Sequence, residues 1–201
     1  MSDFPIALHG ERIKAVIVGG GAVATRKALS LIDAGARVTV VAPDVTDELM
    51  EAERMRRLKI IREEYDRDRI KGMNLVIAAT DSRDVNAQIA VDADSNGQLV
   101  NIIDYPDEGN FHSMALHRSG DITIAVSSGG VPGAATRIRD AIAERFDSRY
   151  ERAVSVLRGL RARSLAIGDD RWRDAASTLL DNDFCTSVEN GTFADKADSW
   201  R

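Results

Sequence analysis

A glycine-rich turn lies between an apolar stretch and a helical stretch near the start of the chain. Residues 16–24 read Val-Ile-Val-Gly-Gly-Gly-Ala-Val-Ala, which fits the pattern G-x-G-x-x-G/A. In that pattern the first glycine makes a tight turn, the second admits a pyrophosphate, and the last small residue lets helix and strand pack closely. A purely structural turn is the alternative. The sequence predicts a dinucleotide-binding turn formed by Gly19, Gly21, Ala22, Val23 and Ala24.

The residues after the second apolar stretch bear on which dinucleotide is bound. An acidic residue at this strand end usually holds the ribose hydroxyls of NAD. Here Pro43 and Asp44 follow the stretch 37–42, so that Asp44 lies just beyond the strand end. The basic residues Arg26 and Lys27 lie in the first helix, away from the place where a 2′-phosphate is usually read. The sequence favours NAD over NADP, with Pro43 and Asp44 at the ribose. A turn or cap role for Asp44 is the alternative.

Polar residues follow two further apolar stretches, at the sheet edge where open α/β folds bind ligands. Thr80 and Asp81 end the stretch 75–79, and Asp104 directly follows the stretch 99–103. We expect Thr80 and Asp81 to contact the cofactor. A carboxylate in this place can take a proton from a substrate, so Asp104 is the candidate general base. The alternative is that Asp104 only caps the loop that follows.

A second glycine-containing loop precedes a helical pattern further along the chain. Residues 127–130 read Ser-Ser-Gly-Gly, a composition suited to binding an anion through backbone N–H groups. Ser128 and Gly129 are therefore candidate substrate contacts, with a simple turn as the alternative. Arg137 in the following helix can hold a carboxylate with two hydrogen bonds, unless it is an ordinary solvated arginine.

Two histidines can transfer protons near neutral pH. His112 and His117 are five residues apart and have no cysteine partners nearby, so they make a poor metal site and we expect no bound metal. His112 is a candidate substrate contact. A loop or interface position is the alternative for both.

The elements that must position these residues alternate between strand and helix. Strands are expected at 14–18, 37–42, 58–62, 75–79 and 99–103, and helices at 22–34, 46–57 and 84–95. This alternation predicts an α/β fold with a Rossmann-type parallel sheet and helices on both faces. Beyond it, a strand is expected at 121–126, with helices from 134 and up to about 165 and at 172–180. We divide the chain into an NAD-binding Rossmann domain (1–112), a small α+β unit (113–148) and a helical C-terminal domain with a polar tail (149–201).

Composition narrows the class of protein. The net charge of −5 and the sequence pI near 5.3 argue against nucleic-acid binding, which normally requires a basic face. No apolar run approaches the roughly 20 residues of a membrane span, and the start of the chain lacks a signal-peptide pattern. The single cysteine, Cys185, excludes an intrachain disulfide. We expect a cytoplasmic protein with no membrane or nucleic-acid partner.

Several segments together resemble the sirohaem synthase dehydrogenase family, in the order and spacing of that family. The segments are 19–27, 34–43, 76–81 with Asn86, 100–104, and 125–130 ahead of an arginine-containing helix. The resemblance covers roughly residues 4–165. One departure follows the Asp104 loop, where Met114 stands in the place of the proline that many members have.

The resemblance implies a stand-alone precorrin-2 dehydrogenase that converts precorrin-2 to sirohydrochlorin with NAD as cofactor. It implies a homodimer interlocked around the middle unit, a tetrapyrrole bound between domains, and no fused methyltransferase domain. It also implies that Asp104 acts in dehydrogenation and, in some relatives, in metal insertion. One alternative is a bifunctional enzyme that also inserts Fe²⁺ or Co²⁺ into sirohydrochlorin. Another is a nucleotide-sensing regulatory module without enzymatic activity.

Overall fold

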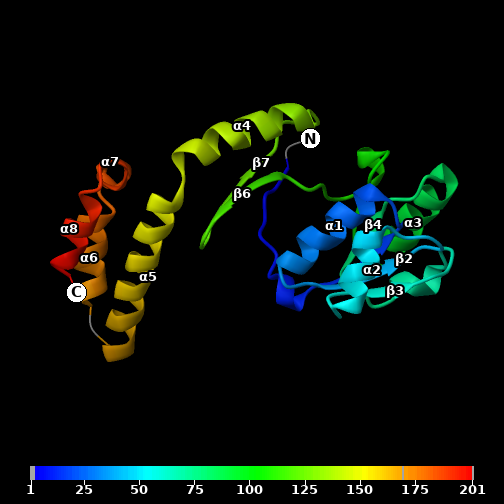
Figure 1. Cartoon of the computed structure of the whole chain (residues 1–201), viewed down its shortest axis with the longest axis horizontal. Coiled ribbons are helices and arrows are strands. Elements are labelled where there is room, and N and C mark those ends of the chain that lie inside the picture. Colours follow the sequence, from blue (N-terminus) through cyan, green and yellow to red (C-terminus); the bar gives the residue numbers. More distant parts are fainter. Residues whose placement is uncertain (1–2, 169, 201) are drawn as a thin grey trace. The chain divides into compact units, whose positions relative to one another are not determined.

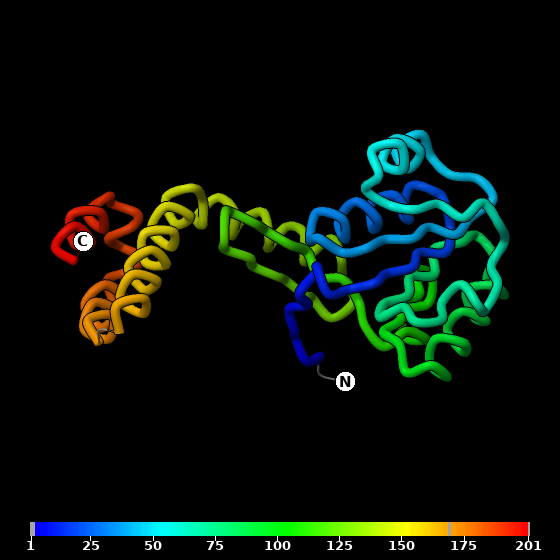
Figure 2. The backbone as a smooth tube through the Cα atoms, turned by 90° about the horizontal axis from the view of Figure 1, so that it is seen from below, coloured from blue at the N-terminus to red at the C-terminus, as the bar shows by residue number. Residues whose placement is uncertain are grey.

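The computed structural model describes residues 3–168 and 170–200 and divides into two compact units (Figures 1 and 2). The first unit ends at His112 and the second begins at Ser113. Each unit has hydrophobic clusters of its own. No helix among the described residues is both long enough and apolar enough to cross a bilayer.

The first unit is built on a five-stranded parallel sheet with the strand order β3-β2-β1-β4-β5 (Figure 1). Its strands are β1 (Lys14–Val18), β2 (Arg37–Val41), β3 (Lys59–Ile61), β4 (Leu75–Ala78) and β5 (Leu99–Ile102). Its helices are α1 (Ala22–Asp33), α2 (Asp47–Arg54) and α3 (Arg83–Ser95), with the 3-10 helices η1 (Gly10–Arg12), η2 (Arg67–Ile70) and η3 (Pro106–Glu108). The predicted Rossmann-type α/β fold is confirmed.

Alternate side chains of the central strand β1 enter two separate clusters. Ala15 and Ile17 pack with residues of α1 and α2, whereas Val16 and Val18 pack with residues of α3 and η2. Both faces of the sheet are therefore covered, which explains why β1 is apolar almost throughout. Ala24 is fully buried in the first cluster, so its small side chain lets α1 lie close to the sheet.

Local hydrogen bonds and backbone turns set the helix boundaries. The Thr46 hydroxyl accepts a hydrogen bond from the Leu49 N–H and caps α2, and the Ser82 hydroxyl caps α3 in the same way. Helix α2 ends at Arg54 rather than near residue 57, because the chain turns there and Arg56 has a φ of 57°. A residue in the left-handed region commonly ends a helix.

The second unit begins with an antiparallel hairpin against which a helix packs. Strand β6 (Ala115–Ser119) pairs with β7 (Ile122–Val126), and α4 (Pro132–Arg145) contacts both strands. Only β7 is predicted from the sequence. Strand β6 reads Ala-Leu-His-Arg-Ser, which has too few apolar residues to indicate a strand by alternation, and its pairing with β7 supplies what the pattern lacks.

Helices α5 (Ser148–Ile167), α6 (Arg171–Leu179), α7 (Phe184–Glu189) and α8 (Phe193–Asp198) complete the described part of the second unit. The expected polar tail after residue 191 is wrong. The Phe193 side chain is only 5% exposed, and its ring packs edge-on against that of Phe184 with centroids 5.5 Å apart. The segment looks polar in sequence, yet Phe193 and Ala197 lie on one side of α8 and join the aromatic cluster around Tyr150.

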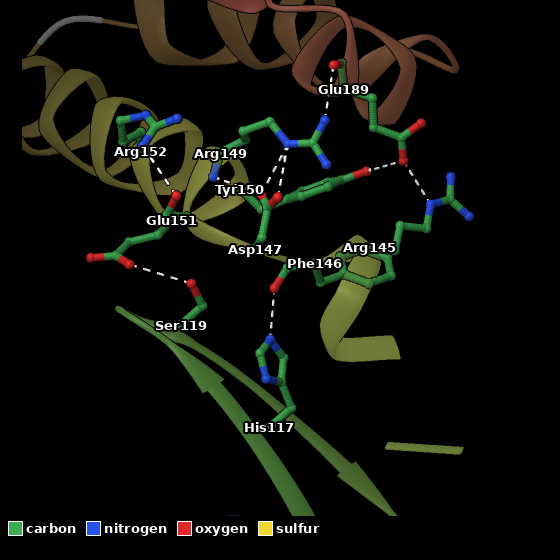
Figure 3. A network of polar contacts seen from close by, with 11 residues as sticks. His117, Ser119, Arg145, Phe146, Asp147, Arg149, Tyr150, Glu151, Arg152 and Glu189 are labelled. Carbon is green, nitrogen blue, oxygen red and sulfur yellow. Dashed lines mark hydrogen bonds and ion pairs between the residues drawn. The ribbon is translucent and has the colours of Figure 1, made fainter. Parts of the chain in front are cut away.

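A polar network ties the start of α5 to α7 and to the hairpin (Figure 3). The Tyr150 hydroxyl donates to Glu189 at 2.8 Å, and Glu189 also accepts from Arg145 at 2.6 Å. These two hydrogen bonds lower the pKa of the Glu189 carboxyl. At the junction of α4 and α5, the His117 ring lies 2.6 Å from the carbonyl oxygen of Phe146. The network fixes the helices of the second unit around buried Tyr150.

Substitutions at Gly19 and Gly72 test how far the stability of the first unit depends on the close contact of Gly19 with Ala79. Both have positive φ, 120° and 72°. A Cβ on Gly19 would lie 2.2 Å from the carbonyl oxygen of Ala79, whereas a Cβ on Gly72 would meet no atom within 4 Å. We expect Gly72→Ala to lower the free energy of unfolding by about 1–2 kcal/mol, and Gly19→Ala to lower it clearly more. Urea unfolding of the full chain measures both losses, and equal losses would contradict the importance of this contact.

Candidate functional site

The polar residues that follow the strands lie along one edge of the sheet. Because the strands are parallel, their carboxyl ends share this edge, with the glycine loop after β1 and Pro43 and Asp44 after β2. Residues 79–81 follow β4, and Asp104 follows β5. The strand order reverses between β1 and β4, since β2 and β3 lie on one side and β5 on the other. Open α/β sheets bind ligands at such a switch point.

Two glycines of the loop after β1 pack directly against neighbouring backbone. Gly19 donates its N–H to the carbonyl oxygen of Val41 at 2.9 Å and lies against Ala79 on its other side. A Cβ on Gly20 would lie 1.9 Å from the carbonyl oxygen of Asp44. Only glycine fits at either position, so the loop is fixed between the ends of β2 and β4.

Gly21 has open surroundings, in contrast to the two glycines before it. It is the N-cap residue of α1, no side chain of the described residues caps the helix there, and a Cβ would meet no atom within 4 Å. Ala22 is exposed and Val23 is half-buried in the first turn. The first N–H groups of a helix have no partner within the helix, and together with the dipole they favour a phosphate. These residues fit the pyrophosphate of a nicotinamide dinucleotide.

A pair of hydroxyl groups holds α1 against the loop that follows β2. Thr25 Oγ1 donates to the carbonyl oxygen of Gly21 at 3.0 Å and lies 2.8 Å from Thr46 Oγ1. The Thr46 N–H donates to the carbonyl oxygen of Gly20 at 3.1 Å. Residues 43–44 immediately precede this anchored segment and are exposed. The predicted ribose contacts therefore lie beside the glycine loop, on a backbone that cannot move independently of it.

Asp104 is joined to the end of β4 by a buried amide. Asn86, in the first turn of α3, donates from Nδ2 to Asp104 Oδ2 at 3.0 Å and to the carbonyl oxygen of Thr80 at 3.0 Å. The Thr80 hydroxyl donates to Asn86 Oδ1 at 2.7 Å. Asp104 itself is exposed, and so is Asp81 beside Thr80. The structure thus brings together Asp104 and Thr80, which the sequence places far apart.

The sequence analysis does not assign Asn86 to the site, although its place on the buried face of α3 could have indicated a role. Asn86, Ile89, Ala90 and Ala93 are the buried side of α3, at the spacing of a helix face that packs on a sheet. A polar residue at the first of these positions indicates a hydrogen-bonding task, because a buried amide without partners is costly.

A second contact from α3 fixes the segment that follows Asp104. The guanidinium of Arg83 lies 4.0 Å from the centre of the Tyr105 ring and also pairs with Glu108 of η3. Stacking of arginine on an aromatic ring contributes about 0.5–1 kcal/mol at an exposed site. No sequence pattern predicts this clamp, because Arg83 belongs to α3 whereas Tyr105 and Glu108 lie at η3.

The remaining predicted residues lie elsewhere. His112 is the last residue of the first unit, and its exposed ring lies 3.7 Å from the carboxylate of Asp3. Ser128, Gly129 and Arg137 belong to the second unit. The Ser128 hydroxyl donates to the carbonyl oxygen of Val131 just before α4, Gly129 has a φ of 59°, and Arg137 is exposed on α4. The start of α4 has no side-chain cap among the described residues.

Comparisons with known proteins agree with this geometry. The profile of the NAD(P)-binding family matches residues 6–115, which cover the first unit almost completely. The siroheme synthase of Chromobacterium violaceum is 34% identical over 196 residues, 95% of this chain and 41% of that protein. The siroheme synthase of Saccharophagus degradans is 33% identical over 200 residues, 98% of this chain and 42% of that protein. The chain thus spans about two fifths of the length of these curated relatives.

A solved structure resembles the chain along its whole length. It is described as SirC, a precorrin-2 dehydrogenase, and it superposes with a TM-score of 0.80 and 25% sequence identity, covering 98% of this chain and 100% of the other. The likeness therefore includes the hairpin and helices of the second unit as well as the sheet. The family match over more than half of the chain shows that it belongs to the NAD(P)-binding family, and the structural match shows that it shares the fold of SirC.

Proposed function

We propose that the chain oxidises precorrin-2 to sirohydrochlorin, with NAD as the hydride acceptor. The observation that carries this proposal is the exposed Asp104 carboxylate, held by a buried amide at the same sheet edge as the open start of α1. The full-length likeness to SirC supports the substrate. We assign the cofactor to the first unit and much of the substrate recognition to the second.

The residues of the first unit hold the cofactor. The glycine loop and the N–H groups at the start of α1 would hold the pyrophosphate, for which Gly21 leaves room. Pro43 and Asp44 would contact the adenine ribose, and Thr80 and Asp81 would contact the nicotinamide half of the cofactor. A bound nicotinamide supplies a hydride acceptor, and the protein supplies position and charge.

NAD is preferred over NADP because acidic Asp44 follows β2, where a 2′-phosphate would otherwise be read. The basic pair Arg26 and Lys27 lies on α1 instead. Burial of Lys27, with a smaller contribution from neighbouring Arg26, lowers the pKa of the Lys27 ammonium. An ammonium that is partly desolvated in this way is less suited to reach out to an exposed phosphate.

Asp104 takes the proton that the reaction releases. Conversion of precorrin-2 to sirohydrochlorin removes two hydrogens, one as a hydride that leaves with the cofactor and one as a proton. The exposed Asp104 carboxylate can approach a macrocycle laid over the sheet edge and pass the proton on to water. The exposed position also leaves room for a macrocyclic substrate.

The substrate carries several carboxylates, and the second unit offers groups that bind them. The loop before α4 has two glycines with positive φ, Gly129 and Gly130, and leads to a helix start without a side-chain cap in the described residues. Ser128 lies in this loop, and Arg137 is exposed one turn into α4. Backbone N–H groups and a guanidinium are complementary to carboxylates. We assign Ser128, Gly129 and Arg137 of the second unit to the substrate, together with His112 at the end of the first unit.

We also propose that two copies associate through the hairpin and α4. A two-stranded hairpin alone is marginally stable, and no residue of β6 or β7 is fully buried within this chain. Apolar side chains on the same elements are exposed, with Leu116 at 36% and Ile138 at 48%. A second copy that packs on these elements would cover them.

Gly21→Ala should leave the fold intact and weaken cofactor binding. The φ of Gly21 is −80°, which alanine adopts freely, and its Cβ would meet no protein atom. The added methyl group would occupy the space of the pyrophosphate, so we expect the Kd for NAD⁺ to rise about tenfold or more, which is 1.4 kcal/mol or more. Titration calorimetry with NAD⁺, and with NADP⁺ for comparison, measures this. Unchanged NAD⁺ affinity in a folded variant would place the cofactor elsewhere.

Asp104→Ala should abolish most turnover without affecting cofactor affinity. General-base catalysis contributes about 10²–10⁴-fold, and we expect kcat to fall by that range. Anaerobic incubation with precorrin-2 and NAD⁺ reports both NADH and the sirohydrochlorin spectrum. Asp107→Ala, which removes an exposed acid of the neighbouring helix η3, is the matched control. Full turnover by Asp104→Ala would refute the assigned base, and NAD⁺ binding without any wild-type turnover would favour a nucleotide-sensing module.

Ile138→Asp should convert the proposed dimer to a monomer. A buried, unpaired carboxylate at the contact is strongly unfavourable. Sedimentation equilibrium of the wild-type chain should give twice the chain mass of 21.9 kDa, and the variant should give the single mass. Leu165→Asp alters an exposed apolar residue of α5 and serves as the control. A monomeric wild type, or a dimer unaffected by Ile138→Asp, would exclude this interface.

A further inference from the structure

Asn86 is a fully buried amide whose hydrogen bonds run between two strand ends. Its side chain comes from the first turn of α3 and meets Thr80 after β4 and Asp104 after β5. The strands β4 and β5 are neighbours in the sheet, so the amide spans the gap between their carboxyl ends. A buried side chain in this place joins backbone on one strand to a carboxylate on the next.

The orientation of this amide is dictated by its partners. Both hydrogens of Nδ2 are used, one on the Thr80 carbonyl oxygen and one on Asp104 Oδ2, each at 3.0 Å. Oδ1 accepts from the Thr80 hydroxyl at 2.7 Å and from the Thr80 N–H at 3.3 Å. A flipped amide would turn its oxygen toward a carbonyl and a carboxylate, where no donor exists. The N–H that faces Asp104 is therefore fixed.

Among the described residues, one oxygen of Asp104 accepts a hydrogen bond and the other does not. Oδ2 accepts the Asn86 hydrogen bond, and within the described part of the chain Oδ1 accepts none. The carboxylate is exposed, so without Asn86 it would exchange freely between rotamers. A hydrogen bond from a buried, immobile donor holds one oxygen and leaves the other oxygen directed away from the amide.

The contact to Asp104 is not needed to start α3. The Ser82 hydroxyl caps this helix, and the Asn86 backbone N–H donates to the Ser82 carbonyl oxygen. Another buried amide, Gln98, performs a purely structural task just before β5, where its Nε2 donates to the carbonyl oxygens of Ile70 and Met73. Gln98 contacts backbone alone through this group, whereas Asn86 also holds an exposed carboxylate.

We propose that Asn86 is a positioning residue for Asp104: it holds Oδ2 so that Oδ1 is presented to the substrate proton. This role rests on the proposed function of Asp104 as the base. Arg83 lies one turn earlier on α3. Its contacts with Tyr105 and Glu108 hold the backbone segment that follows Asp104. The first turn of α3 thus fixes both the carboxylate and the segment that follows it. Preorganised geometry of this kind raises rates because the reacting atom is already in place.

The test is a double-mutant cycle on the full chain with Asn86→Ala, Asp104→Ala and the double variant. We expect Asn86→Ala alone to lower kcat about tenfold to a hundredfold, with the Kd for NAD⁺ within about threefold of wild type. In the Asp104→Ala background, Asn86→Ala should have no further effect on turnover, because its partner is gone. Gln98→Ala is the matched control, since it loses a buried amide from the same domain and should reduce stability while leaving kcat unchanged.

The outcomes separate this role from the proposed function. The positioning role would be overturned if the losses of kcat multiplied in the double variant. It would also be overturned if Asn86→Ala and Gln98→Ala lost kcat equally, because Asn86 would then act on general stability. An absence of turnover in the wild type would overturn the proposed function itself, and this role with it. If Asn86→Ala does not fold, Asn86→Ser replaces it in the cycle, because the shorter hydroxyl can bond to Thr80 but cannot also reach Asp104.

Discussion

The arrangement of the sheet edge in the first unit depends on one constraint. This constraint is the close contact of the glycine loop with the ends of β2 and β4. Gly19 lies against Ala79, and Gly20 lies against the carbonyl group of Asp44. These contacts draw three strand ends together at the point where the strand order reverses. Because the loop is held on both sides, Gly21 and the start of α1 remain open without being mobile. A rigid and uncovered helix start is what a pyrophosphate requires.

The first turn of α3 extends the same principle to the other half of the sheet edge. A parallel sheet brings strand ends to one edge but does not orient the side chains that follow them. Asn86 does so for Asp104 through a buried amide, and Arg83 does so for the next segment through Tyr105. The glycine loop packs closely because it lacks side chains, whereas α3 orients its neighbours through the side chains of Asn86 and Arg83. A dinucleotide requires open space beside the backbone, whereas a general base requires a carboxylate held in a fixed orientation.

The sequence predicts the first unit well because local signals and tertiary structure agree there. Apolar stretches, glycines and caps mark each strand and helix, and residues 19–24 predict the tight turn between β1 and α1 without any structure. Asn86 and Arg83 are harder to assign, because their partners lie in other elements and no local pattern joins them. Strand β6 and helix α8 are missed for a related reason. Both are polar in sequence and owe their form to contacts, β6 to its pairing with β7 and α8 to the ring of Phe184.

Charge distinguishes the two units in a way that fits the proposed chemistry. The first unit carries the excess of acidic residues that makes the chain acidic, whereas acidic and basic residues are balanced in the second. The second unit nevertheless carries local positive charge, because α5 has five arginines and Arg137 is exposed on α4. Several α5 arginines already have partners, as Arg158 has Asp121 at 2.5 Å. Arg137 forms no ion pair among the described residues, so a carboxylate of the proposed substrate could pair with it without first displacing another acid.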